Sequence, residues 1–396
     1  MSNLKIFSEK IKINGRRVIV RLDLNVPVNK SNIEDSTRIQ IVEPFIHKLI
    51  EKKAKIILIS HLGRPKGKIV KEMSLYPIFI YLQKCLNSKV YFYKKKIDQN
   101  AINASNNLKP GEVLLIENIR FFKEEEDDDE NFAKSLSKLG DVYINEAFSC
   151  SHRKQASLHK ITNYIDSYGG PLLDKEIRSI NLIIKNKKEP VTSIIGGSKV
   201  STKINVLLNL TKNTNNIIIV GAMANNFLKF NGLNVGSSLL EKDAEGVIKD
   251  IYSSAKKYKC NILVPIDCVV SESLDGLPKL KDLNEISPND IILDIGKKTI
   301  ELIYKTIENS KTIFWNGPAG YFENKNFSKG TISIAKKIGD NTNSKSLISI
   351  VGGGDTIASI KNTEFRKAFT HLSTAGGAFL ESIEGNELPG IKVLKK

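Results

Sequence analysis

The chain has 396 residues, of which 41% are hydrophobic and 26% charged, and this composition indicates a folded globular protein of two or three domains. Lysine and arginine number 60 against 43 acidic residues, so the formal net charge is +17. This surplus favours an anionic partner: a nucleic acid, an anionic membrane or a small anion. The sequence has no long apolar run, no signal-like N-terminus and four scattered cysteines. We therefore expect no membrane span, secretion signal or structural zinc, and a reducing, cytoplasmic location.

Short β-branched runs alternate with helical patterns along the chain. Strands are expected at 17–22, 55–60, 89–93, 112–116, 141–145, 191–195, 216–220, 261–265, 311–315 and 346–351. Helical patterns lie between most of them, for example at 38–53, 74–87, 200–210, 328–338 and 376–384. Such alternation is typical of parallel sheets covered on both faces, and ten strands are better divided between two sheets. The predicted fold is therefore α/β, with two doubly wound parallel-sheet domains joined by a hinge helix.

A boundary is expected near Gly170 and Pro171, where the preceding structure breaks and a helical pattern begins that ends at Pro190. This predicts a first domain over 1–171, a hinge helix over 172–189 and a second domain over 190–396. A return of the C-terminal tail to the first domain is left open as an alternative. Most of the positive surplus lies in the first half. The acidic run KEEEDDDE, residues 123–130, is interpreted as a solvated loop or helix start.

In the second half, glycine-rich turns follow four strands, at 194–203, 219–225, 350–356 and 373–379. Glycine lets a ligand approach the backbone, and the amides at a helix start favour an anion, so these turns predict phosphate binding. Asp355 follows three glycines and is a candidate Mg²⁺ ligand or a helix N-cap. Lys199 and Lys203 stand four apart, on one face of the expected helix, and suit two neighbouring phosphates unless they are simply a surface pair. The absence of GxxxxGK[ST] and GxGxxG disfavours P-loop and dinucleotide-binding enzymes.

The first half has a different set of polar residues at its strand ends. Five of the chain's nine arginines lie there: Arg21, Arg38, Arg64, Arg120 and Arg153. Lysine dominates elsewhere, so arginine is concentrated where a planar, bidentate fork is useful. Carboxylate and phosphate groups fit that fork. The arginines therefore predict a pocket for a small anion.

Six strings carry a family resemblance and occur in order from the N-terminal to the C-terminal half: RLDLNVP (21–27), SHLGRPKG (60–67), IENIRFFKEEE (116–126), IGGSKVSTKI (195–204), WNGPAGYFE (315–323) and VGGGDT (351–356). Through them the whole chain resembles phosphoglycerate kinase. The resemblance implies reversible phosphoryl transfer from 1,3-bisphosphoglycerate to MgADP in glycolysis, giving 3-phosphoglycerate and MgATP, by in-line transfer after domain closure. It also implies a cytoplasmic monomer that uses Mg²⁺ and ATP/ADP and has no nucleic-acid or membrane partner.

The resemblance also assigns residues to roles. The phosphoglycerate would lie in the first domain against Asp23, Asn25, Arg38, His61, Leu62, Gly63, Arg64, Arg120 and Arg153, with Arg21 and His152 nearby. The nucleotide would lie in the second domain against Lys203, Glu323, Gly353, Gly354, Asp355 and Thr356, with Glu323 at the ribose and Asp355 holding Mg²⁺. Arg38, Lys199 and the backbone amides of Gly353 and Ala375 would stabilise the transferring group, and no general base is needed because nucleophile and leaving group are already anionic.

The sequence departs from the family pattern at four positions. Glu146 and Ser149 stand in a segment that is usually Asp-Ala-Phe-Gly, and Ala222 and Ala375 each replace a usual glycine. If the backbone at Ala375 needs a positive φ, alanine there would cost on the order of 1 kcal/mol and would slow turnover.

Two other classes of protein remain as alternatives. The charge motivates a nucleic-acid-binding protein on the same scaffold, and a nucleotide-dependent dehydrogenase is disfavoured by the missing GxGxxG.

Overall fold

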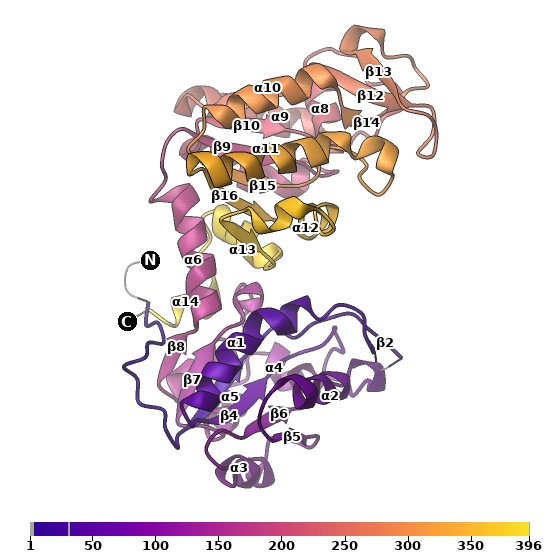
Figure 1. The fold of residues 1–396 in the computed structure, drawn as a ribbon. Coiled ribbons are helices and arrows are strands. Elements are labelled where there is room, and N and C mark those ends of the chain that lie inside the picture. The colour runs from indigo at the N-terminus through magenta and orange to yellow at the C-terminus, as the bar shows by residue number, and fades with distance from the viewer. Residues whose placement is uncertain (1–3, 31, 396) are drawn as a thin grey trace. The chain divides into compact units, whose positions relative to one another are not determined.

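The computed structural model describes residues 4–30 and 32–395 (Figure 1). Contacts divide the chain into two compact units, one formed by Met1–Ile177 with Glu387–Lys396 and the other by Arg178–Asn386. The chain passes from the first unit to the second within helix α6 (Pro171–Ile184). Each unit is built around its own six-stranded parallel sheet.

The sheet of the first unit has the strand order β5-β6-β4-β1-β7-β8, and all its pairs are parallel. Its strands are β1 (Arg17–Arg21), β4 (Lys55–Ile59), β5 (Val90–Tyr93), β6 (Val113–Ile116), β7 (Val142–Asn145) and β8 (Ser167–Gly169). Its helices are α1 (Thr37–Glu51), α2 (Tyr76–Cys85), α3 (Gln99–Asn106), α4 (Lys123–Glu126), α5 (Glu130–Ser137) and α14 (Pro389–Lys392). A short hairpin, β2 (Val28–Asn29) and β3 (Asn32–Ile33), follows β1.

Alternate residues of the central strands face opposite sides of this sheet, which gives two separate cores. Val18 and Val20 of β1 pack with the apolar faces of α1 and α2. Ile19, between them, packs on the other side with residues of α3 and α5. Because both faces are covered, the strands are apolar along their length, as expected for a parallel sheet.

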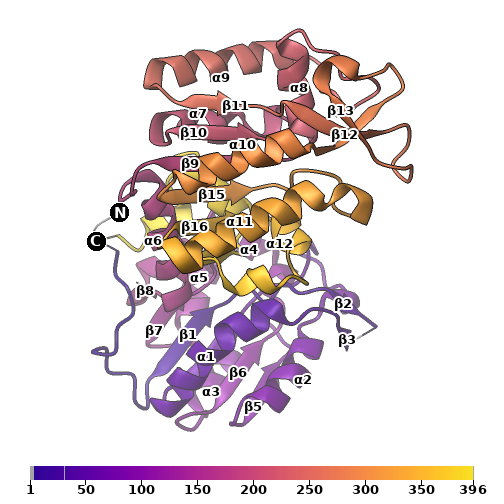
Figure 2. The ribbon, with the colours of Figure 1, turned by 45° about the horizontal axis from the view of Figure 1, so that its top comes forward.

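The sheet of the second unit has the order β11-β10-β9-β15-β16-β17 and is also parallel. Its strands are β9 (Val191–Ile195), β10 (Asn216–Ile219), β11 (Asn261–Leu263), β15 (Thr312–Asn316), β16 (Ile348–Gly352) and β17 (His371–Ser373). A three-stranded antiparallel sheet adds β12 (Asp267–Ser271), β13 (Lys279–Asp282) and β14 (Ile291–Ile295). The helices are α7 (Ile204–Asn213), α8 (Ala222–Phe230), α9 (Ala244–Tyr258), α10 (Lys297–Glu308), α11 (Lys329–Lys345), α12 (Gly354–Ser359) and α13 (Gly377–Ile383). In Figure 2, α10 and α11 lie side by side, and their isoleucines belong to the same core as Trp315 of β15.

The predicted α/β class with two parallel sheets is confirmed, and all ten predicted strands are present with ends within two residues. Helix α6 ends at Ile184, before the expected 189, and α11 continues to Lys345, beyond the expected 338. Three further features differ from expectation. The antiparallel sheet β12–β14 and the short edge strands β8 and β17 were not predicted, because their few residues carry no clear alternation. The helix expected from residue 200 begins at Ile204, after a 3₁₀ turn over Ser201–Lys203. Within the described residues, no helix is long and apolar enough to cross a membrane.

Candidate active site

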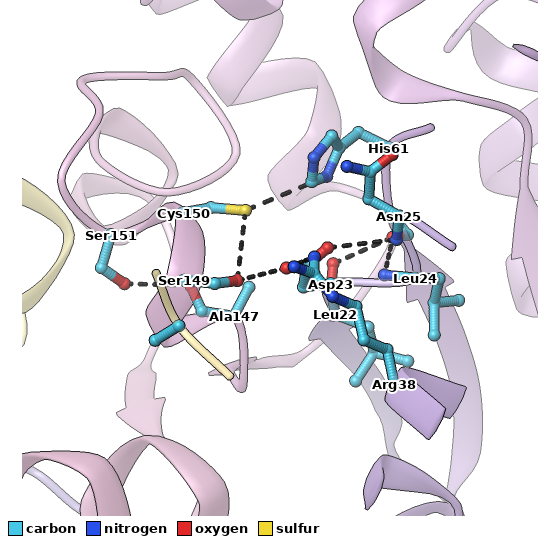
Figure 3. A network of polar contacts seen from close by, with 12 residues as sticks. Leu22, Asp23, Leu24, Asn25, Arg38, His61, Ala147, Ser149, Cys150 and Ser151 are labelled. Carbon is cyan, nitrogen blue, oxygen red and sulfur yellow. Dashed lines mark hydrogen bonds and ion pairs between the residues drawn. The ribbon is translucent and has the colours of Figure 1, made fainter. Parts of the chain in front are cut away.

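The centre of the polar network in the first unit is Asp23, which follows β1 by two residues. Its carboxylate forms an ion pair with the Arg38 guanidinium, from the first turn of α1, and accepts a hydrogen bond from the Ser149 hydroxyl (Figure 3). The same carboxylate accepts the Asn25 amide at 3.1 Å. The loops after β1 and β7 are therefore tied to the start of α1 through one side chain.

Hydrogen bonds from neighbouring strand ends extend this network. The Asn25 side-chain oxygen accepts the Gly63 amide at 2.8 Å, and Arg120 Nη1 donates to the Gly63 carbonyl at 2.8 Å. Asn118, which sequence reasoning did not single out, donates its side-chain amide to the Leu62 carbonyl at 2.7 Å. The loops after β1, β4 and β6 thus meet at the carboxyl edge of the sheet, where ligands of parallel sheets bind.

His61 lies within the predicted arginine group and is 3% exposed. Burial lowers the pKa of His61 well below its ordinary value of 6.5, and the charges of Arg21, Arg120, Arg153 and Arg38 lower it further. The imidazole is therefore neutral near pH 7, and it can donate or accept a hydrogen bond without adding charge. Four of the five predicted arginines act on this one side chain, so they surround a common region that favours an anion.

Two predicted binding residues lie at the edge of this network. Arg64 is exposed. Arg153 is half-buried and its Nε donates to His152 Nε2 at 3.2 Å. Burial also lowers the pKa of His152, with a further contribution from Arg153. The binding roles of Arg64 and Arg153 remain predictions.

Among the described residues, one group of three metal-type ligands occurs, formed by Asp23, His61 and Cys150, whose ligand atoms lie within 4.8 Å of one another. Cys150 Sγ is 3.9 Å from His61 Nδ1 (Figure 3). The arginines that lower the pKa of His61 would repel a cation in the same place. The arginine charges therefore argue against a cation site at these three side chains.

The departures at 146 and 149 both have structural roles. The Ser149 hydroxyl adds a donor to Asp23 that a glycine would lack. Glu146 is 1% exposed, and its carboxylate accepts the amides of Leu172 at 2.9 Å and Leu173 at 3.3 Å, at the first turn of α6. It therefore caps that helix from the end of β7.

Glu146→Gln is expected to gain stability relative to wild type as pH rises. Burial raises the pKa of Glu146 from 4.5 to about 8, and Asp174 adds to the rise. The folded carboxyl therefore holds its proton between these values while the unfolded one releases it, so its contribution to stability falls as pH rises from 4.5 to about 8. Denaturant unfolding at pH 5 and pH 8 should show a relative gain of at least about 1 kcal/mol for the variant, because one pKa unit is worth about 1.4 kcal/mol. A pH-independent difference would contradict this assignment.

In the second unit, a cavity of about 310 Å³ opens among the glycine turns. Apolar side chains form much of its lining, including Leu228, Leu239 and Phe322, and Glu323 and Asp355 are also among its lining residues. Gly197 and Ala222 belong to it as well, so, together with Asp355, three of the four glycine turns line this cavity. A mostly apolar lining with a few polar groups suits a flat ring that carries a polar, charged tail.

Lys203 is half-buried and lies beside this cavity, since its Nζ is 3.4 Å from where a Cβ of the lining residue Gly197 would stand. Its Nζ donates to the Gly196 carbonyl at 2.5 Å and to Asn316 Oδ1 at 2.7 Å. Burial lowers the pKa of Lys203 from 10.5 to about 8, while Asp355 opposes the shift. Asn316, at the end of β15, was not predicted as a site residue. Its position directly after the apolar strand in WNGPAG is the signal that could have found it.

The prediction that Lys199 and Lys203 share one helical face is wrong. Lys199 is exposed and precedes the 3₁₀ turn, whereas Lys203 is the last residue of that turn, is half-buried, and donates its Nζ to the Gly196 carbonyl. Glu241 accepts the amides of Val200 at 2.8 Å and Ser201 at 3.1 Å. The carboxylate of Glu241 therefore already accepts hydrogen bonds from two amides of this turn, where the sequence predicted phosphate binding.

The turn after β16 depends on glycine. Gly353 has φ of +98°, and a Cβ there would lie 2.7 Å from Asn316 Nδ2. Asp355 is exposed in the first turn of α12. Thr356 is fully buried and its hydroxyl accepts the Gly317 amide at 2.7 Å, which holds the loop after β15. Its predicted phosphate contact, and those of Gly353 and Gly354, remain predictions.

Ala375→Gly is expected to change kcat by less than about twofold, since alanine is unstrained at negative φ. Gly376 takes the positive φ of this turn, at +55°, and Ala375 is not among the positive-φ residues of the described chain. The Ala375 amide donates to Ser373 Oγ at 3.3 Å. Steady-state kinetics of the variant test this; a severalfold faster kcat would show that alanine does limit turnover.

The two sheets, the arginine pocket and the glycine-lined cavity define a two-unit α/β phosphotransferase. The family model described as phosphoglycerate kinase matches residues 8–386, and the chain belongs to this family. It is 42% identical over 394 residues to a phosphoglycerate kinase from Rhizobium meliloti (strain 1021), covering 99% of both chains, and 41% identical over 390 residues to one from Wolbachia pipientis wMel, covering 98% of both. A solved phosphoglycerate kinase structure from Coxiella burnetii has a TM-score of 0.90 at 36% identity over 98% of both chains. The resemblance and the enzyme class, a phosphotransferase with a carboxyl acceptor, are confirmed.

Proposed function

We propose that the first unit binds the phosphoglycerate and the second binds MgADP or MgATP. The observation that carries the first assignment is the convergence of Arg21, Arg38, Arg120 and Arg153 on His61, at the carboxyl edge of a parallel sheet. A phosphorylated carboxylic acid offers two anionic groups to such a pocket. The cavity beside Lys203 supports the second assignment, because its lining includes Glu323, proposed to bind the ribose hydroxyls, and Asp355, proposed for the phosphate end.

The residues near Lys203 also fit Mg²⁺. Asp355 is an exposed carboxylate in the cavity lining, and Mg²⁺ prefers one or two carboxylates together with substrate phosphates. Asp355 would hold the ion, which supplies neutralisation of the phosphate charges when bound. The proposed ligand, the Asp355 carboxylate, is an oxygen donor, which agrees with a hard cation.

The proposed reaction moves one phosphoryl group between two oxygens. In the ATP-forming direction, a β-phosphate oxygen of ADP forms a bond to phosphorus while the bond from phosphorus to the acyl oxygen breaks, and the carboxylate leaves with the electron pair. No proton is transferred, so the protein's task is positioning and charge neutralisation.

Arg38 is proposed to neutralise the charge of the transferring group, and Lys203 is proposed to neutralise the charge of the nucleotide phosphates. Lys199 and the Gly353 and Ala375 amides are proposed to assist. The chemistry requires both ligands to meet in line, for which we propose closure of the two units.

A cytoplasmic monomer is proposed, following the family resemblance. The four cysteines are all free, which agrees with a reducing compartment. No nucleic-acid partner is proposed.

Isothermal titration of the intact chain tests the division of ligands between sites. We expect one site for 3-phosphoglycerate and one for MgADP, each filled without the other. D-glycerate, which lacks the phosphate, should bind at least about 100-fold more weakly, because charge-assisted arginine contacts to the phosphate are lost. Equal binding of glycerate and 3-phosphoglycerate would contradict the proposed pocket.

A further inference from the structure

One member of the acidic run 123–130 is not solvated. Glu125, the third residue of α4, is 0% exposed, whereas its neighbour Glu124 is exposed and Glu126 is half-buried. The interpretation of the run as a solvated segment is therefore wrong at this residue. Burying a carboxylate is costly unless it is well bonded, so its surroundings account for its position.

Three hydrogen bonds join Glu125 to the segment that follows Arg153. Glu125 Oε2 accepts the Ser157 amide at 2.8 Å, and Oε1 accepts the Ser157 hydroxyl at 2.6 Å. The Glu125 carbonyl accepts the Ala156 amide at 3.0 Å. Both carboxyl oxygens act as acceptors, so the ionised form satisfies every one of these contacts.

Ser157 passes the connection on to Arg21. The same hydroxyl that donates to Glu125 accepts Arg21 Nε at 2.9 Å, and the Ser157 carbonyl accepts the Tyr143 hydroxyl at 2.6 Å. Arg21 is 0% exposed, and its Nη2 has no hydrogen-bond partner among the described residues. This buried guanidinium is therefore fixed largely through its Nε contact to Ser157 and its Nη1 contact to the Leu22 carbonyl.

Charge links Glu125 to the pocket a second time. Burial raises the pKa of Glu125, and the charges of Arg21 and Arg120, together with the Ser157 hydrogen bonds, oppose the rise. Arg120 is 2% exposed and its Nε is unpartnered within the described chain. The same two arginines that favour the ionised form of Glu125 thus also act on His61.

We propose that Glu125 is a positioning residue of the phosphoglycerate pocket. It fixes Arg21 through Ser157 and ties the loop that carries Arg153 to the loop that carries Arg120. This inference rests on the proposed substrate site. It differs from a simple charge effect in sign: removing a negative charge from an unchanged pocket would strengthen binding of an anion, whereas releasing the arginines weakens it.

Glu125→Gln keeps the shape of the side chain and removes the charge and one acceptor. We expect the KM for 3-phosphoglycerate to rise at least about tenfold while the KM for MgATP stays within about twofold, since only the first unit is changed. Glu124→Gln, the exposed neighbour, is the matched control and should leave both values unchanged. A KM for 3-phosphoglycerate that is unchanged or lower in Glu125→Gln would overturn the proposal.

A second variant covers the case in which Glu125→Gln fails to fold. Ser157→Ala removes the hydroxyl between Glu125 and Arg21 but keeps the backbone contact, and it should raise the same KM at least about threefold. Where both single variants fold, the double variant should resemble the stronger single one, because the two act through one connection. If the two substitutions raised the KM for 3-phosphoglycerate by independent factors that multiply, the connection from Glu125 through Ser157 to Arg21 would be contradicted. Absence of turnover in wild type would contradict the proposed function itself, whereas wild-type KM values in the variants would contradict only this inference.

Discussion

Replacing Arg38 by alanine is expected to lower kcat/KM for 3-phosphoglycerate at least about 100-fold while the KM for MgATP stays within about twofold. Arg38 is the arginine that pairs with Asp23, and its side chain is 35% exposed, so it can reach a ligand. It lies in the first turn of α1, where the helix dipole adds to the positive potential. Loss of its guanidinium group removes both a binding contact and the charge that neutralises the transferring group.

Two further variants sharpen this test. Arg38→Lys keeps the charge but loses the bidentate geometry, so its kcat/KM should lie between wild type and Arg38→Ala. Lys48→Ala removes a basic residue from the same helix, where Lys48 pairs with Glu9 at the surface, and should retain wild-type kinetics. If Arg38→Ala and Lys48→Ala had equal activities, Arg38 would have no role in transfer.

The second large effect is expected for Lys203→Met. The KM for MgATP should rise at least about tenfold with the KM for 3-phosphoglycerate nearly unchanged, because a charge-assisted contact to the phosphates is lost. The pKa of about 8 adds a pH test: in the free wild-type protein the ammonium loses its proton as pH rises through 8, so nucleotide affinity should fall there. The variant should lack this pH dependence. Lys212→Met, an exposed change on α7, is the control.

Stability separates a binding role of Lys203 from a structural one. Because the folded pKa of about 8 lies below the ordinary 10.5, the charged side chain opposes folding below pH 8, and this penalty diminishes as pH rises toward 10.5. Lys203→Met should therefore unfold at a denaturant concentration no lower than wild type at pH 7. Marked destabilisation together with equal losses for both substrates would contradict a role confined to the nucleotide.

The parallel strands could be predicted because their apolar runs are bounded by polar turns, as at 191–195. His61 and Arg120 could be identified because long motifs place them after β4 and β6, two strands that meet at one sheet edge, whereas Arg38 lies outside those motifs, in the first turn of α1. Lys199 and Lys203 show the limit of this reasoning. Their spacing fits a helix, but the turn before α7 separates them, and an internal carboxylate from Glu241 occupies the amides there.

Glu125 could not have been predicted from the acidic run, since its neighbours are the same residue type. Its burial depends on Ser157, 32 residues further along the chain, and no local pattern records that contact. Likewise, the fit of Ala375 depends on Gly376 accepting the positive φ, which the substitution alone does not reveal. Buried polar partners and backbone angles are determined by tertiary packing, so they become visible only in the folded chain.

The most direct test of the account is the rate of ADP formation from ATP by the purified chain, measured with and without 3-phosphoglycerate and Mg²⁺. Turnover should require all three components and saturate in both substrates, and it should be lost in Arg38→Ala and strongly weakened in Lys203→Met. No turnover of the wild-type chain at saturating substrates and Mg²⁺, or turnover that does not depend on 3-phosphoglycerate, would contradict it.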